Sequence, residues 1–230
     1  MPQTPVDPRW PKVLSLAVHE LRTPMTVVAG YIRMLLKDRA GPLSDPQRHL
    51  LEETEKSCGR LSALLTEMSD LSGLEAGTAA FNRVPIDLRA ALAEAVSALP
   101  ELPDRSVDVD LQVTPGRAML DADPVRLRAA FSAVLIALRR ELVSSSTLAV
   151  RESVRQIGGQ TMSWIAIADP DRVAEVGRAE ESTLTVFDEW RGGSGLSLGV
   201  ARRVIEAHGG RIWSPVADVK AGAVIALPHL

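Results

Sequence analysis

His19 is a residue that could carry a group between molecules, because a neutral imidazole nitrogen is a nucleophile near neutral pH. Glu20 follows it directly and can hold one ring nitrogen protonated, which leaves a free lone pair on the other. Thr23 comes four residues after His19, so on a helix its hydroxyl shares the same face and can position a water molecule or a phosphoryl oxygen. The stretch LAVHELRTPMT therefore suits phosphoryl transfer at His19, with an ordinary exposed histidine on a coiled coil as the alternative.

The element that carries His19 is predicted to be a long helix. Residues 11–77 show no strand pattern, and His19 stands one place past Val18, so it points away from the helix seam. Pro24 removes the amide that would bond to the Glu20 carbonyl, so we expect a kink or a loosened turn there. The seam itself follows the 4-3 spacing of a coiled coil through Leu14, Val18, Leu21, Met25, Val28, Ile32 and Leu35.

A second helix is predicted to fold back on the first. The segment AGPLSDPQ at 40–47 breaks the pattern, and Ser44 or Asp45 can cap a new helix that holds Pro46 in its first turn. Two helices of about 27 residues cannot enclose a core alone, so we expect a homodimer built as a four-helix bundle. The second seam consists mainly of Leu50, Leu61, Leu64, Leu65, Met68 and Leu71.

The remaining chain has the pattern of a mixed domain. Two domains are therefore expected, 1–77 and 78–230, the second an α+β sandwich with helices over one face of a sheet. Helices are predicted at 123–141 and at 196–208, where Gly209 and Gly210 end the second one. Strands are predicted at 81–88, at 107–113, up to Leu120, and at 148–157, 162–168, 211–213 and 221–227.

Composition excludes several classes of function. The 230 residues are 46% apolar and 24% charged, which is globular, and a net charge of −3 gives no broad attraction to nucleic acid or anionic lipid. No apolar run approaches the roughly 18 residues of a membrane span. Cys58 is the only cysteine, which excludes an internal disulfide and a cysteine-based metal cage and fits a reducing cytosol. We expect a cytoplasmic protein without a signal peptide that contacts neither nucleic acid nor membrane directly.

HELRTP on a long helix, followed by a capped partner helix and an α+β domain, resembles the H-box of two-component sensor histidine kinases. FNRVPIDL at 81–88, DPVRL at 123–127 and GLSLGVARRVIEAHGGRIW at 195–213 resemble motifs of that family's ATP-binding domain. The resemblance implies a dimerisation and histidine-phosphotransfer hairpin followed by a Bergerat-like ATPase domain. It also implies that the chain is either a stand-alone relay or the cytoplasmic part of a longer sensor.

The same resemblance assigns roles to the residues of the hairpin. His19 is then the phospho-acceptor, Glu20 its activating base, and Thr23 a residue that helps to dephosphorylate the response regulator. The implied partner is the receiver domain of a response regulator. All three residues of this set are retained.

Two motifs of the implied ATP domain are altered. The two asparagines that face the triphosphate in the family correspond to Ala133 and Ala137, whose methyl groups cannot supply the oxygen ligands that Mg²⁺ requires. Asp169, which receives the adenine amino group in the family, is retained, but Asp171 replaces a glycine. A carboxylate about 6 Å from a phosphate costs about 3 kcal/mol at an effective dielectric near 20. The alternative is that Asp169 and Asp171 cap the following helix.

The glycine-rich loop is the third departure. Gly193 and Gly195 are retained, but Ser197 replaces the third glycine. Between VFDEW at 186–190 and Gly193 the chain has two residues, where the family has a long flexible ATP lid that closes over the nucleotide. Arg140 stands at the family's usual lysine position and could meet a phosphate.

Three hypotheses follow from these residues. In the first, a degenerate, dimeric member of the family passes phosphoryl groups between response-regulator aspartates, or to water, through His19 and binds ATP and Mg²⁺ weakly or not at all. In the second, a working kinase binds ATP in a divergent manner through Asp169, Gly193 and Gly195. In the third, a non-catalytic scaffold keeps His19 as a relic. Retention of the hairpin residues favours the first.

Overall fold

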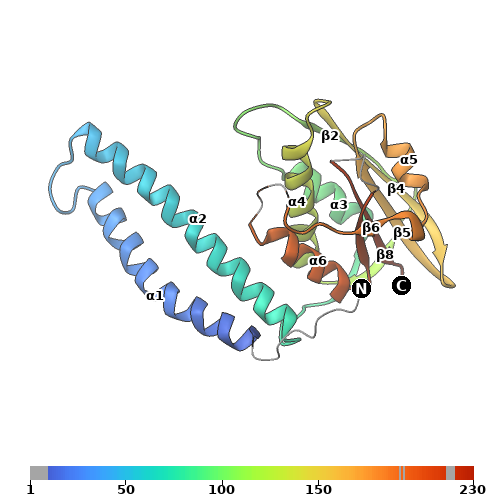
Figure 1. The fold of residues 1–230 in the computed structure, drawn as a ribbon, viewed down its shortest axis with the longest axis horizontal. Helices are drawn as coiled ribbons and strands as arrows, with labels where there is room; N and C mark the ends of the chain where they lie inside the picture. Colours follow the sequence, from blue (N-terminus) through green and yellow to red (C-terminus); the bar gives the residue numbers. More distant parts are fainter. Residues whose placement is uncertain (1–9, 192, 194, 216–220) are drawn as a thin grey trace. The chain divides into compact units, whose positions relative to one another are not determined.

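The computed structural model describes residues 10–191, 193, 195–215 and 221–230, and the chain divides into compact units that meet between Ala79 and Ala80. In the first unit, α1 (Trp10–Leu36) and α2 (Asp45–Glu75) form a helical hairpin (Figure 1). The predicted hairpin is therefore confirmed, and α1 remains one helix through Pro24. Within the described residues, neither these nor any other helix combines the length and the apolarity needed to cross a membrane.

The turn of the hairpin is fixed by local hydrogen bonds. Ser44 is the N-cap of α2, and its backbone N–H donates to Oε1 of Gln47 at 2.9 Å, while Pro46 lies in the first turn as predicted. Arg48 donates to both carboxylate oxygens of Asp38 at 2.8 and 2.9 Å, which ties α2 to the end of the loop. These bonds define where α1 ends and α2 begins.

The contact between α1 and α2 buries only part of the predicted seams. Val18 and Ile32 of α1 and Cys58 and Leu65 of α2 are buried. At the open end of the hairpin, the Ser72 hydroxyl donates to the Pro11 carbonyl at 2.7 Å. A second strip of large apolar side chains stays exposed in the single chain, including Leu21, Val27, Val28, Tyr31 and Met34 of α1 and Leu50, Leu61 and Leu64 of α2. The hairpin alone therefore does not cover its apolar surface.

The second unit is built on a six-stranded mixed sheet in the order β2-β4-β5-β8-β7-β6. β2 pairs with β4 in parallel, and all the remaining pairs in the sheet are antiparallel. A separate antiparallel pair joins β1 and β3. The strands are β1 (Val84–Asp87), β2 (Asp108–Gln112), β3 (Met119–Ala122), β4 (Thr147–Ile157), β5 (Gln160–Ala168), β6 (Thr185–Val186), β7 (Arg211–Ser214) and β8 (Ala223–Pro228).

Three helices lie together on one side of this sheet: α3 (Leu88–Ser97), α4 (Pro124–Glu141) and α6 (Ser197–Ala207) (Figure 1). The α+β sandwich is confirmed, but helices do not lie over one face only. The short helix α5 (Val173–Arg178) packs on the opposite face, where Val173 and Val176 join a cluster with Trp164 and Ala166 of β5. A 3₁₀ turn, η1 (Glu181–Thr183), follows it.

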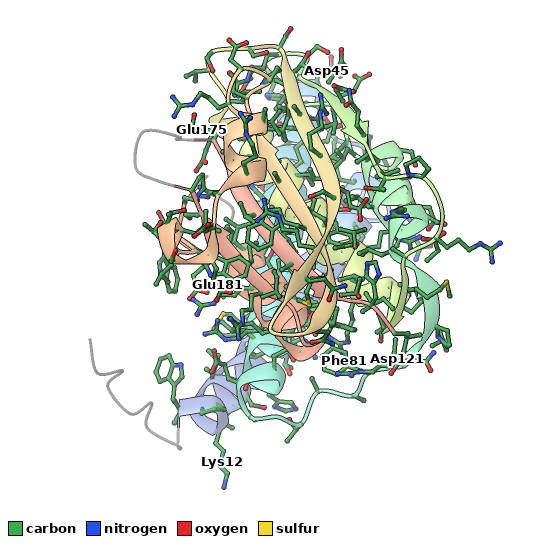
Figure 2. All side chains as sticks on the ribbon, turned by 90° about the vertical axis from the view of Figure 1, so that its right-hand side faces the viewer. Lys12, Asp45, Phe81, Asp121, Glu175 and Glu181 are labelled. Atoms are coloured by element: carbon green, nitrogen blue, oxygen red, sulfur yellow. The ribbon has the colours of Figure 1, made fainter. Side chains whose placement is uncertain are left out.

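The N-terminus of α4 is anchored by a buried histidine. The backbone N–H of Asp123 donates to Nε2 of His208 at 2.9 Å, and Nδ1 of His208 lies 2.7 Å from the carbonyl of Val204. Burial lowers the pKa of His208, which keeps the ring neutral and able to accept that bond. The ring of Phe81 meets His208 edge-on at 5.2 Å, and in Figure 2 the labels of Phe81 and Asp121 both lie at the lower end of the unit.

A buried ion pair joins α3 to the sheet. Nε of Arg89 donates to Oε2 of Glu152 at 3.0 Å, the Ser163 hydroxyl donates to Oε1 at 2.7 Å, and the Thr114 N–H donates to Oε2 at 2.9 Å. Burial alone would raise the pKa of Glu152, but the hydrogen bonds from Arg89, Ser163 and Thr114 outweigh it and lower the pKa. Glu152 is therefore held as a carboxylate.

Replacing this carboxylate should destabilise the second unit strongly. We expect Glu152→Ala to lower the free energy of unfolding by about 3–5 kcal/mol, because it leaves Arg89 buried without a counter-charge. Since the folded pKa of Glu152 is below its unfolded value, its contribution is complete above the usual glutamate pKa and is lost as pH falls through the folded value. Urea unfolding followed by tryptophan fluorescence, at neutral and acidic pH, measures both effects.

The matched control is Glu94→Ala, which removes an exposed ion pair to Arg128 of 3.4 Å and should change stability by less than about 1 kcal/mol. Equal effects of the two substitutions at neutral pH would contradict the importance of the buried pair.

Candidate functional site

His19 and Glu20 form a contact on the solvent-facing side of α1. Nδ1 of His19 lies 3.2 Å from Oε1 of Glu20, and the two side chains are 79% and 70% exposed. A carboxylate can only accept a hydrogen bond, so the contact assigns the proton to Nδ1 and leaves the lone pair on Nε2. Nε2 has no hydrogen bond to any described residue and is open to an incoming phosphoryl group.

Thr23 lies one helical turn after His19, on the same face of α1, and is exposed. The buried side chain of Val18 fixes this part of the helix against α2, so His19, Glu20 and Thr23 are presented outward from a rigid element. The structure thus places the three predicted hairpin residues at one exposed site. Its chemistry is that of a nucleophilic imidazole with an adjacent carboxylate and a nearby hydroxyl.

The predicted nucleotide residues lie in the second unit, and they do not form a comparable set. Arg140 is exposed in the last turn of α4, and among the described residues its side chain has no hydrogen bond or ion pair. Gly193 and Gly195 are exposed and have left-handed backbone conformations, with φ of 58° and 62°. In the part of the chain that the structure describes, no polar contact joins Arg140 to Asp169.

Asp169 follows β5 and is occupied by contacts within the protein. Oδ2 accepts a hydrogen bond from the Ser144 hydroxyl, and Oδ1 accepts one from the backbone N–H of Asp171 at 3.1 Å. The Asp169 carbonyl also accepts from the N–H of Val173 at 2.9 Å, in the first turn of α5. With these bonds Asp169 fixes the turn that leads into α5, on the sheet face opposite α4.

The α4 positions of the implied Mg²⁺ ligands carry only methyl groups. Ala137 is fully buried by the protein's own atoms, and Ala133 is half-buried one turn before it. Mg²⁺ requires oxygen ligands in near-octahedral geometry, and this face of α4 supplies none at either position. Among the residues described, no group of three or more His, Cys, Asp or Glu side chains could hold a metal ion. The residues present do not fit a nucleotide-bound Mg²⁺ ion.

Sequence reasoning did not identify Arg191 as a side chain of this region. Its Nε lies 3.7 Å from Oε2 of Glu141, at the end of α4, and its guanidinium lies 5.2 Å from the ring of Phe187. Arg191 and Glu141 are 50 positions apart, so no local pattern marks the pair. The only sequence signal is that Arg191 immediately precedes the glycine-rich loop.

Known proteins with similar sequences and structures are histidine kinases. Residues 12–77 match the His Kinase A (phospho-acceptor) domain. The chain is 29% identical over 205 residues to the circadian input-output histidine kinase CikA of Synechococcus elongatus. The aligned region covers 86% of this chain and 27% of CikA. It is 30% identical over 216 residues to the adaptive-response sensory-kinase SasA of Prochlorococcus marinus, and here the aligned region covers 88% of this chain and 54% of SasA.

A solved structure with the same fold is that of full-length ShkA in complex with AMPPNP. It matches with a TM-score of 0.69 and 21% identity, over 95% of this chain and 45% of the ShkA chain. The hairpin with its exposed histidine and the mixed-sheet domain thus define a signalling protein of the phospho-acceptor class. The chain belongs to the two-component sensor histidine kinase family and corresponds to its signalling core. It spans about a quarter of CikA and about half of SasA.

Proposed function

We propose that this protein is a dimeric phosphotransfer hub that moves phosphoryl groups between response-regulator aspartates, or to water, without using ATP. The observation that carries the proposal is the contrast between the two units. His19 and Glu20 keep an exposed nucleophile–carboxylate contact of 3.2 Å, whereas α4 has methyl groups at Ala133 and Ala137. Phosphoryl transfer from ATP depends on positioning and on charge neutralisation by metal ions and hydrogen-bond donors, which this face of α4 lacks.

The transfer step follows from the geometry of His19. The Nε2 lone pair attacks the phosphorus atom of an aspartyl phosphate in line, so an N–P bond forms as the P–O bond to the aspartate breaks. The aspartate carboxylate leaves with the bonding electrons. Glu20 accepts the hydrogen bond from Nδ1–H and stabilises the positive charge that develops on the ring. The reverse step on a second receiver domain completes the relay.

The hairpin supports a homodimer as the working form. Its exposed apolar strip lies on both α1 and α2 and includes Val27, Tyr31 and Leu61. Pairing two copies into a four-helix bundle removes this strip from water. The burial stabilises the dimer by about 25 cal/mol per Å² of apolar surface. His19 is exposed in the single hairpin, and the proposed transfer requires that it stays accessible in the dimer.

The dimer can be tested by light scattering. We expect the wild-type protein to have twice the chain mass of 24.7 kDa. Leu61→Glu should shift the protein towards the monomer, because each copy loses about 1.5–3 kcal/mol of apolar burial and gains a charge in the bundle. Val143→Glu, at an exposed valine of the second unit, is the control and should leave the mass unchanged. A wild-type monomer at micromolar concentration would refute the dimer.

The source of the phosphoryl group can be tested with two donors. With labelled ATP and Mg²⁺ we expect no acid-labile label over hours, because the nucleotide domain lacks metal ligands on α4. With labelled phosphoramidate, a donor that needs no nucleotide site, we expect label on the wild type and on His49→Ala but not on His19→Ala. ATP-derived label that disappears in His19→Ala would instead establish a working kinase with a divergent nucleotide site, formed around Asp169, Gly193 and Gly195.

The relay itself is measured with phosphorylated receiver domains from the same organism. We expect wild-type protein to take label onto His19, and Glu20→Gln, which keeps the shape but removes the charge, to slow this step by about 10²-fold or more. Thr23→Ala should retain transfer to His19 but slow dephosphorylation of the receiver by about tenfold, the effect of one lost hydrogen bond to water. Receivers that bind with equal affinity to wild type and His19→Ala, without any transfer of label, would favour the scaffold alternative.

A further inference from the structure

The segment that connects β6 to the glycine-rich loop is bound to the body of the second unit. Oε2 of Glu189 lies 3.4 Å from Nη1 of Arg202 and 3.3 Å from Nη1 of Arg203, both on α6. The backbone N–H of Asp188 donates to the Ser214 hydroxyl of β7 at 3.1 Å. Glu189 and Asp188 therefore attach this segment to α6 and β7, and these attachments do not depend on Arg191.

Arg191 extends these attachments to α4 and to the start of β8. Its Nη2 donates to the carbonyl of Gly222 at 2.5 Å, and its Nε faces Oε2 of Glu141 at 3.7 Å. The Arg191 side chain is 11% exposed and lies over Phe187, which is buried. An arginine is almost never buried unless its charge is paired, and Glu141 is the carboxylate that pairs with it.

The pair stands on the face of α4 that the resemblance assigns to nucleotide. Ala133, Ala137 and Glu141 follow one another at intervals of four residues, so they form one stripe along the helix. Ala137 is fully buried by the protein's own atoms and Ala133 is half-buried, so the protein itself covers the middle of this stripe. Glu141 stands at the end of the stripe and its charge is paired with Arg191, so this cation is not free to attract a triphosphate.

We propose that the Arg191–Glu141 pair is an internal latch that takes the place of a bound nucleotide: it joins residues 187–191 to α4 and β8 and keeps the covered face of α4 closed. The inference rests on the proposed function, in which this domain does not use ATP. The resemblance places a triphosphate against this face of α4, and here an arginine and a glutamate of the chain join α4 to the segment that precedes the glycine-rich loop. The latch holds one closed conformation without any ligand.

The test is hydrogen exchange of the full chain, followed by mass spectrometry in the absence of nucleotide. Arg191→Met keeps the aliphatic length and removes the charge, and Glu141→Gln keeps the shape of the partner. Each should speed exchange by about tenfold in residues 187–191, in residues 221–224 and in the last turn of α4. In these variants local opening no longer has to break the ion pair, so it becomes more frequent. Arg128→Met, which removes the exposed pair to Glu94 on the same helix, is the matched control and should leave exchange there unchanged.

The double variant Arg191→Met/Glu141→Gln separates the pair from the single residues. If the latch is right, its effect is smaller than the product of the two single effects, since each substitution already breaks the same contact. Wild-type exchange rates in the single variants overturn the proposal, and so does an increase spread evenly over the second unit, which indicates general destabilisation.

A second arm repeats the exchange on the wild type with ATP and Mg²⁺. Unchanged exchange in residues 187–191 supports the latch, and protection of these residues overturns it. Failure of the proposed function is seen separately, as ATP-derived label on His19. The latch can therefore fail while the proposed function stands, and the two failures are distinguishable.

Discussion

The burial of α4 is the constraint on which the second unit depends. Five of its large apolar side chains are at most 1% exposed, and both ends of the helix are held by buried polar groups. Asp123 fixes the N-terminus through His208, while near the C-terminus Arg139 donates to the carbonyls of Val107 and Pro100, both at 2.8 Å. These contacts do not involve Ala133, so a methyl group at this position is compatible with the fold. The five side chains are Leu127, Phe131, Val134, Leu135 and Leu138.

This separation is compatible with the proposed function, in which an intact fold is combined with an altered nucleotide site. The side chains that hold α4 in place are apolar or form fully buried hydrogen bonds, so their loss costs stability directly. Of the two positions that face a nucleotide in the family, Ala137 is fully buried and Ala133 is half-buried, and neither supplies a polar group. On the hairpin the reverse applies to His19 and Glu20, which are exposed and add little to stability but determine what the helix can do.

Most of the fold could be predicted from the sequence, because its long elements have strong local signals. The turn at 40–47, the Asp123 cap and the stop at Gly209 all act within a few residues of the helix that they begin or end. Helix α3 was missed although Asp87 caps it, and α5 has only six residues, too few for periodicity to show. The geometry of the proposed hairpin site follows from helical spacing. The surroundings of the α4 stripe depend on contacts between distant segments, which local patterns do not encode.

Charge balance distinguishes the two units at the level of mechanism. In the proposed relay, the carboxylate of Glu20 lies beside a His19 ring that becomes positive when it takes a phosphoryl group, so the pair would assist a reaction with an anionic donor from outside. At the end of α4 the positive charge of Arg191 is already matched by Glu141 inside the protein. Burial lowers the pKa of Arg191 and raises that of Glu141, and the attraction between the two groups opposes both shifts. A cation committed in this way is not available to neutralise a triphosphate, whereas the exposed imidazole remains free to react.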